Sequence, residues 1–74
     1  MGISKIYLHI GQRVEYFRTK ANFSQEELAQ EAGVSRTYLG TIEQGKKRVS
    51  LEILEKVAKA LDIPLVRLFE DHHS

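Results

Sequence analysis

The chain of 74 residues contains no cysteine and no tryptophan, and its single proline is Pro64. Without cysteine there can be no disulfide bond and no thiolate metal site to stabilise the fold. A domain of this size buries only about 60% of the surface that its unfolded chain exposes, so its stability must come from helix packing, from oligomerisation, or from both. The apolar share of 42% is nevertheless enough for a hydrophobic core, which excludes a disordered tail.

An excess of charge of one sign is also absent, because 11 lysines and arginines stand against 10 aspartates and glutamates, for a formal net charge of +1. The total charge therefore identifies no partner, although a near-neutral total can hide a local patch. Three basic residues are consecutive, while the acidic residues gather elsewhere: Lys46, Lys47 and Arg48, against Glu26, Glu27, Glu31, Glu52 and Glu55.

Long apolar runs are missing as well. No stretch approaches the roughly 18 apolar residues of a membrane span, and no signal peptide is visible. We therefore expect a cytoplasmic protein that does not contact a membrane.

The three histidines, His9, His72 and His73, are not accompanied by a nucleophile or carboxylate in an arrangement typical of catalysis, and there is no glycine-rich phosphate loop. The adjacent pair His72 and His73 could suggest a metal site, but two histidines on a tail are more typical of a solvated end. We expect no enzymatic activity, no metal and no cofactor.

The hydrophobic residues near the N-terminus follow a helical repeat. Ile6, Ile10, Val14 and Phe17 recur at intervals of four, four and three, which predicts an amphipathic helix over about residues 4–20. Asn22 follows, and asparagine is the residue best able, after glycine, to take the left-handed conformation that ends a helix.

Each of the next three helices begins at a serine that can act as its N-cap: Ser24, Ser35 and Ser50. Glu27 completes a capping box with the first of these serines, and Gly33 and Gly45 end the second and third helices. The fourth helix carries an apolar face made of Leu51, Leu54, Val57, Ala58 and Leu61. Pro64 suits the first turn of a short fifth helix. The pattern predicts an all-α fold, a compact bundle of five helices that forms one domain over residues 1–74, with its core between about residues 6 and 70.

Two of these helices are short and are joined by about three residues around Gly33, an arrangement typical of a helix-turn-helix. Ala29 is small where the two helices must approach each other, and Gly33 permits the positive φ of a tight turn. Six positions satisfy the requirements of the motif together: Leu28, Ala29, Gly33, Val34, Leu39 and Ile42.

The outer face of the third helix carries Arg36, Gly40 and Gln44 at intervals of four, with Thr37 and Thr41 beside them. These side chains are small or polar, which suits a helix that enters the DNA major groove, about 12 Å wide. Glycine inside a helix costs about 1 kcal/mol relative to alanine. Gly40 therefore either lets the backbone approach base edges, or is a tolerated flaw, or makes room for a neighbouring side chain.

The run Lys46, Lys47 and Arg48 follows the end of the third helix, where a loop would flank the groove and could reach phosphates. The alternative is a solvated loop whose lysines only maintain solubility. Gln25, the first residue of the second helix, could add a phosphate contact together with the backbone N–H groups at that helix start.

Residues 10–69 resemble the lambda-repressor/Cro-type helix-turn-helix family, also called the XRE family, on the stretch SQEELAQEAGVSRTYLGTIEQGKKRVSLEILEKVAKALDIPLVRLF. Within that family the chain is similar to the controller proteins of restriction–modification systems and to compact phage-type repressors. It departs from the family pattern at Asn22, where glycine is usual, and at Val49, where proline is common. The absence of proline at position 49 is expected to loosen the loop before the fourth helix. We expect no appended effector-binding or protease domain, and therefore no small-molecule ligand.

The resemblance implies a role for each matching position. The residues expected to read bases are Ser35, Arg36, Thr37, Gly40 and Thr41. The residues expected to contact the DNA backbone are Gln25, Lys46, Lys47 and Arg48, with Thr19 or Lys20 at the end of the first helix. The resemblance also implies a buried ion pair between Arg18 and Glu43.

The resemblance further implies a homodimer that places two recognition helices about 34 Å apart on a pseudo-palindromic double-stranded DNA operator. The expected dimer contact lies on the fourth and fifth helices, through Leu65, Val66 and Phe69. The predicted function is a sequence-specific transcriptional regulator, either repressor or activator, and activation would require a contact with RNA polymerase through the acidic second helix. The alternative is a protein-interaction module, such as an antitoxin or a coactivator-like partner, that uses the same scaffold.

Overall fold

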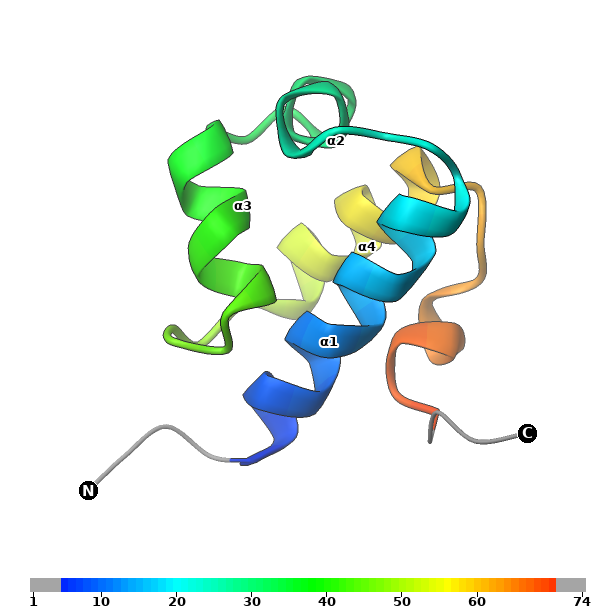
Figure 1. The fold of residues 1–74 in the computed structure, drawn as a ribbon. Helices are drawn as coiled ribbons and strands as arrows, with labels where there is room; N and C mark the ends of the chain where they lie inside the picture. Colours follow the sequence, from blue (N-terminus) through cyan, green and yellow to red (C-terminus); the bar gives the residue numbers. More distant parts are fainter. Residues whose placement is uncertain (1–4, 71–74) are drawn as a thin grey trace.

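The computed structural model describes residues 5–70 of the chain, and this part is built from helices without strands. The helices in chain order are α1 (Lys5–Lys20), α2 (Gln25–Ala32), α3 (Arg36–Glu43), α4 (Leu51–Ala60) and a 3₁₀-helix, η1 (Leu65–Leu68). Figure 1 shows α1 running diagonally across the molecule, with α3 along one side, α2 across the top and η1 on the opposite side. No helix between residues 5 and 70 is both long and apolar enough to span a membrane.

The boundaries of the helices follow local chemistry. Ser24 and Glu27 form a complete capping box at the start of α2, in which each side chain accepts a hydrogen bond from the other residue's backbone N–H. Asn22 and Gly33 take left-handed φ values of 62° and 76°, at the end of α1 and in the turn between α2 and α3. The predicted end of α1 and the predicted start and end of α2 are therefore confirmed.

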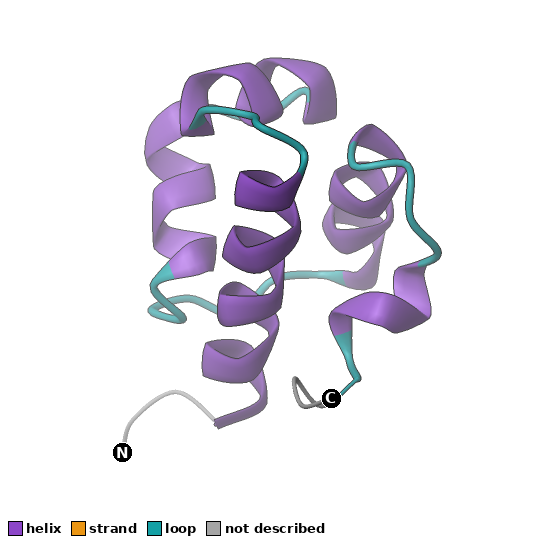
Figure 2. Ribbon diagram, turned by 45° about the vertical axis from the view of Figure 1, so that its right-hand side comes forward, coloured by secondary structure: helices purple, strands orange, loops and turns teal. Residues whose placement is uncertain are grey.

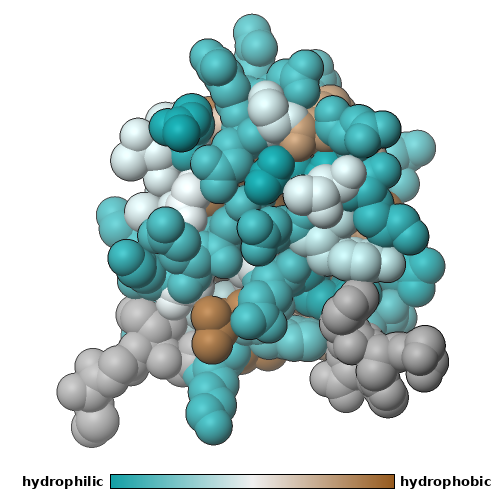
Figure 3. All heavy atoms as spheres, viewed as in Figure 1, coloured by the Kyte–Doolittle hydropathy of each residue, from teal (hydrophilic) through white to brown (hydrophobic). Residues whose placement is uncertain are grey.

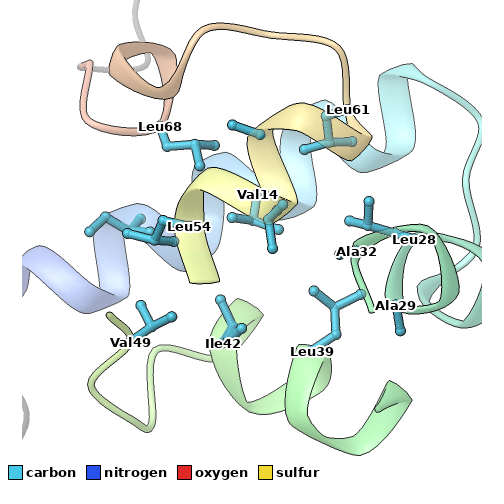
Figure 4. Close-up of a cluster of buried hydrophobic side chains, with 13 residues drawn as sticks. Val14, Leu28, Ala29, Ala32, Leu39, Ile42, Val49, Leu54, Leu61 and Leu68 are labelled. Carbon is cyan, nitrogen blue, oxygen red and sulfur yellow. The ribbon is translucent and has the colours of Figure 1, made fainter. Parts of the chain in front are cut away.

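The core forms where the helices of the described chain meet. α1 packs on α3, α2 packs on both α3 and α4, and η1 packs on α1 and α4. Figure 4 shows the buried side chains pointing toward one another from all these elements, and seven are almost fully inaccessible: Val14, Leu28, Leu39, Ile42, Leu54, Val57 and Leu68. Leu28, Ala29, Leu39 and Ile42 are buried as the helix-turn-helix pattern predicted, whereas Val34 is only half-buried.

Three expectations about the helices need correction. The fifth element is a four-residue 3₁₀-helix rather than an α-helix, and Pro64 precedes it as the capping residue instead of lying in its first turn. Leu51 is 62% exposed, because Val49 in the preceding loop is buried and fills the core beside Leu54 at this point (Figure 4). The exposed Ile6 lies in the first turn of α1, which extends beyond the helices that pack on it (Figure 1).

Candidate nucleic-acid interface

Helix α3 lies on one side of the molecule, with its outer face turned away from α1 and α4 (Figure 1). Its inner residues Leu39 and Ile42 are buried, while Arg36 and Thr37 are exposed and Thr41 is half-buried. In the space-filling view this side of the molecule is hydrophilic or neutral, and hydrophobic colour is confined to small areas (Figure 3). The residues expected to read bases therefore share an accessible, polar surface.

Two hydroxyl groups of this surface are engaged by their own helix. The Ser35 Oγ accepts a hydrogen bond from the backbone N–H of Tyr38 at 3.0 Å and thereby caps α3. The Thr41 hydroxyl donates to the carbonyl oxygen of Tyr38 at 2.6 Å. Because its hydrogen is used in this way, Thr41 has only oxygen lone pairs and a methyl group to offer to a ligand.

Gly40 lies beneath the amide group of Gln25. A Cβ atom added at Gly40 would be 3.9 Å from Gln25 Oε1 and 4.0 Å from Gln25 Nε2, which is ordinary van der Waals contact. An alanine would therefore fit at this position in the free chain. Packing of a neighbouring side chain does not require the glycine.

Gln25 begins α2, and its side chain reaches across to the end of α3. Its Nε2 donates a hydrogen bond to Glu43 Oε1 at 2.9 Å, and the residue is half-buried. The backbone N–H groups of Gln25 and Glu26 are in the first turn of the helix, where no intrahelical acceptor is available. The start of α2 thus presents hydrogen-bond donors beside α3.

The ion pair implied by the family resemblance is formed. Arg18 Nε and Glu43 Oε2 are 2.6 Å apart, and Arg18 Nη2 donates to Glu43 Oε1 at 3.2 Å. Arg18 Nη1 also donates to the carbonyl oxygen of Phe23 at 2.9 Å. The exposed fractions of the Arg18 and Glu43 side chains are 13% and 4%, so the pair is buried. It joins the end of α1 to the end of α3.

The basic residues lie on the loop between α3 and α4, and Lys46, Lys47 and Arg48 are all exposed. Figure 2 shows this loop leaving α3 and running behind α1 to reach α4. Gly45, at φ 69°, is pressed against α1, where an added Cβ would lie 2.6 Å from the Cα of Leu8. Val49 is buried on the other side of the basic run. The loop is therefore anchored at both ends.

Gly11, whose role was not predicted from the sequence, lets α1 and α3 pack backbone against backbone. A Cβ atom at Gly11 would lie 2.3 Å from the carbonyl oxygen of Ile42 and 2.7 Å from that of Glu43. The sequence did carry a signal for this contact. Glycine inside a helix lowers stability, so its presence there indicates close packing that offsets the loss. Arg13 was missed as well: it is buried, its Nε donates to the Arg67 carbonyl oxygen at 3.2 Å, and its guanidinium carbon is 4.9 Å from the centre of the Phe17 ring.

The remaining expected residues lie at the end of α1 and on η1. Thr19 is exposed and its hydroxyl donates to the Tyr16 carbonyl oxygen at 3.0 Å, while Lys20 Nζ donates to the Tyr16 hydroxyl at 3.3 Å. Of the expected dimer contacts, Val66 is exposed and Leu65 and Phe69 are half-buried. Leu65 lines an open groove between α4 and the segment that leads to η1.

Within residues 5–70 no three histidine, aspartate or glutamate side chains come together in a way that could hold a metal ion. His72 and His73 lie outside the described residues.

A model of the helix-turn-helix family (HTH_3) matches residues 14–68 of this chain. The control protein C.BamHI of Bacillus amyloliquefaciens is 46% identical over 61 residues, which cover 81% of this chain and 75% of that protein. The crystal structure of the restriction–modification controller protein C.AhdI from Aeromonas hydrophila superimposes with a TM-score of 0.86 at 41% identity, covering 89% of this chain and 100% of that one.

The transcriptional regulator SinR of Bacillus subtilis is 38% identical over 65 residues, which cover 86% of this chain but 59% of the length of SinR. A crystal structure of SinR in complex with DNA superimposes with a TM-score of 0.78 at 39% identity, covering 82% of this chain and 98% of that one. On the family match and these similarities, the chain belongs to the helix-turn-helix family of the XRE type.

Proposed function

We propose that this chain is a sequence-specific transcriptional regulator that binds a pseudo-palindromic double-stranded DNA operator as a homodimer. The observation that carries the proposal is the outer face of α3, where Arg36 and Thr37 are exposed and polar while Leu39 and Ile42 hold the helix on the core. A helix held in this way is a rigid body that fits the major groove. The regulator would act in the cytoplasm, where its DNA lies.

In this proposal α3 reads bases through its outer face. The Arg36 guanidinium would donate two hydrogen bonds to O6 and N7 of a guanine, and the methyl groups of Thr37 and Thr41 would contact thymine methyl groups. Ser35 lies at the start of the helix beside these residues, and Gly40 allows the backbone to come near the base edges. Within the chain, alanine would fit at position 40, so close approach by DNA is the explanation of the glycine that we favour.

Contacts to phosphate would hold the protein in register without reading sequence. Lys46, Lys47 and Arg48 are exposed on a loop that Gly45 and Val49 anchor at both ends. Such anchoring limits the backbone freedom of the loop, which lowers the backbone entropy lost on binding. Gln25 and Thr19 would add neutral contacts.

A dimer would bring two α3 helices to successive major grooves, about 34 Å apart. We place the dimer contact at Leu65, Val66 and Phe69, because this end of the molecule lies across α1 from α3 (Figure 1) and its apolar side chains are not fully covered. In such a dimer both recognition helices remain free to face DNA.

The biological role that we favour is control of a restriction–modification system, because both C.BamHI and C.AhdI, to which the chain is similar, are named as control proteins. A phage-type repressor is the second candidate for the same DNA-binding activity. If the regulator activates transcription, the exposed carboxylates Glu26, Glu27 and Glu31 would meet RNA polymerase, since they are on α2, the helix that precedes the proposed recognition helix.

The test is a selection of bound duplexes from a random pool, followed by mobility shifts at increasing salt. We expect enrichment of two inverted half-sites about one helical turn apart, and an affinity that falls steeply with salt. If no sequence is enriched and no saturable shift is seen, the chain is a protein-interaction module instead.

A further inference from the structure

The carboxylate of Glu43 is a junction between three helices. One of its oxygens, Oε2, lies 2.6 Å from Arg18 Nε of α1. The other, Oε1, accepts from Arg18 Nη2 at 3.2 Å and from Gln25 Nε2 of α2 at 2.9 Å. Because only 4% of the Glu43 side chain is exposed, these protein donors take the place of water around the carboxylate.

This junction determines how the Gln25 amide is turned. A carboxylate can only accept hydrogen bonds, so the nitrogen of the amide, and not its oxygen, must face Glu43. One N–H of Gln25 is then used by Glu43, and the second N–H and Oε1 are left for another partner. The amide lies over Gly40 of α3, where an added Cβ would lie 3.9 Å from Oε1.

The side-chain amide of Gln25 therefore lies between Glu43 and Gly40, on the surface that the proposed function assigns to DNA. A free glutamine side chain loses rotamer entropy when it is immobilised on a ligand, whereas a side chain that is already held loses much less. The second N–H of the amide and the backbone N–H groups in the first turn of α2 are then available as a fixed set of donors, of the kind that binds a phosphate.

We infer that Glu43 is a positioning residue for DNA binding: its buried carboxylate holds the Gln25 amide so that Gln25 binds a phosphate of the DNA backbone. The inference rests on the proposed function. It gives the Arg18–Glu43 pair a role in DNA binding in addition to its role in stability. Arg18 neutralises the carboxylate, Glu43 orients the amide, and Gln25 makes the contact.

A mutant cycle in DNA binding tests this coupling. Gln25→Met keeps the size of the side chain and removes the amide, and R18M/E43M replaces the ion pair by apolar residues of similar volume, a change that buried pairs often tolerate. We expect Gln25→Met to weaken binding of every DNA sequence by about tenfold with an unchanged salt dependence, because a neutral contact to phosphate releases no counterion. In the R18M/E43M background the same substitution should cost only about twofold to threefold, because the amide is no longer held.

The control on the same helix is Gln30→Met, an exposed glutamine that should not alter binding. An equal loss on Gln25→Met in both backgrounds would show that Glu43 does not position the amide. No loss on Gln25→Met would show that Gln25 does not contact DNA, although the proposed function could still stand on the other residues. If the wild-type chain binds no DNA saturably, the proposed function itself fails.

Nuclear magnetic resonance of the free wild-type chain tests whether the Gln25 amide is immobilised. This test needs neither DNA nor a variant that could fail to fold. The side-chain amide of Gln25 should be rigid on the picosecond to nanosecond timescale, whereas the exposed glutamines at positions 12, 30 and 44 should be mobile. An equally mobile Gln25 amide would overturn the inference.

Discussion

Gly11 and Gly40 both lie inside an α-helix, yet their surroundings are opposite. A Cβ at Gly11 would be 2.3 Å from the carbonyl oxygen of Ile42, whereas the nearest side-chain atom to a Cβ at Gly40 is 3.9 Å away. The packing of α1 on α3 therefore requires glycine at position 11, and the packing of the free chain does not require it at position 40. Glycine is thus required by helix packing in α1, whereas in α3 it leaves room on the surface for a larger side chain.

Two ion pairs within residues 5–70 also differ in how far they are enclosed by the protein. Arg18 and Glu43 are 2.6 Å apart with 13% and 4% of their side chains exposed, while Arg67 and Glu70 are 3.1 Å apart with 52% and 43% exposed. Removing one member of a buried pair leaves a desolvated charge, whereas an exposed charge is solvated by water. Removing Glu43 should therefore destabilise the fold much more than removing Glu70.

The largest effect is expected for Glu43→Ala, which leaves Arg18 buried without its partner. We expect the free energy of unfolding to fall by about 3–5 kcal/mol. The matched control is Glu70→Ala in the exposed pair, which should cost less than about 1 kcal/mol. Urea denaturation followed by circular dichroism measures both, and similar losses for the two variants would contradict the division between the pairs.

Gly11→Ala comes next, because the added methyl group would overlap the backbone of α3. We expect the free energy of unfolding to fall by about 1–3 kcal/mol, the range typical of overpacking, although alanine is the better helix former. Thermal denaturation measures the loss. A Tm that is unchanged or higher would mean that α1 and α3 are further apart than the structure places them.

Arg36→Ala tests the outer face of α3. Stability should change by no more than about 0.5 kcal/mol, while affinity for the selected operator should fall by about 1–3 kcal/mol and the preference at one base position should relax. Lys47→Ala is the comparison, since losing a phosphate contact weakens all sequences alike and flattens the salt slope by about 0.9. An equal loss of affinity for all sequences on Arg36→Ala would remove Arg36 from the base-reading residues.

Gly40→Ala is expected to change stability only slightly, and the sign of the change is opposite to that of Gly11→Ala. The free chain should become more stable by about 0.5–1 kcal/mol, because alanine loses less backbone entropy than glycine in a helix. Operator binding should become weaker, because a methyl group would occupy the surface of α3 beside the Gln25 amide, which the proposed function assigns to DNA. Calorimetry and a mobility shift on the same sample measure both quantities, and a stabilised variant with unchanged affinity would show that Gly40 has no part in binding.

The elements of the helix-turn-helix could be predicted from the sequence because their signals are local. A serine oxygen that accepts from a backbone N–H three residues later specifies the start of a helix, as at Ser24 and Ser35. The alternation of Leu39 and Ile42 with polar positions likewise specifies which side of α3 is buried. Leu51 shows the limit of this reasoning, because the helical repeat cannot tell whether a loop residue such as Val49 fills the core first.

Residues far apart along the chain were outside the reach of these patterns. The amide of Gln25 lies 2.9 Å from Glu43, and Gly11 is enclosed by the end of α3, only because the helices cross at particular angles and distances. The family resemblance implied the pairing of Arg18 with Glu43, but neither the resemblance nor the spacing indicated that Gln25 joins them.

By itself, the sequence determined where α2, α3 and α4 begin and which face of α3 is buried, because serine caps and helical periodicity act within a few residues. Only the tertiary structure decided what Gly11, Gly40 and Gln25 contact. The physical reason is that these contacts depend on the relative placement of whole helices, which arises when all the apolar faces pack together at once.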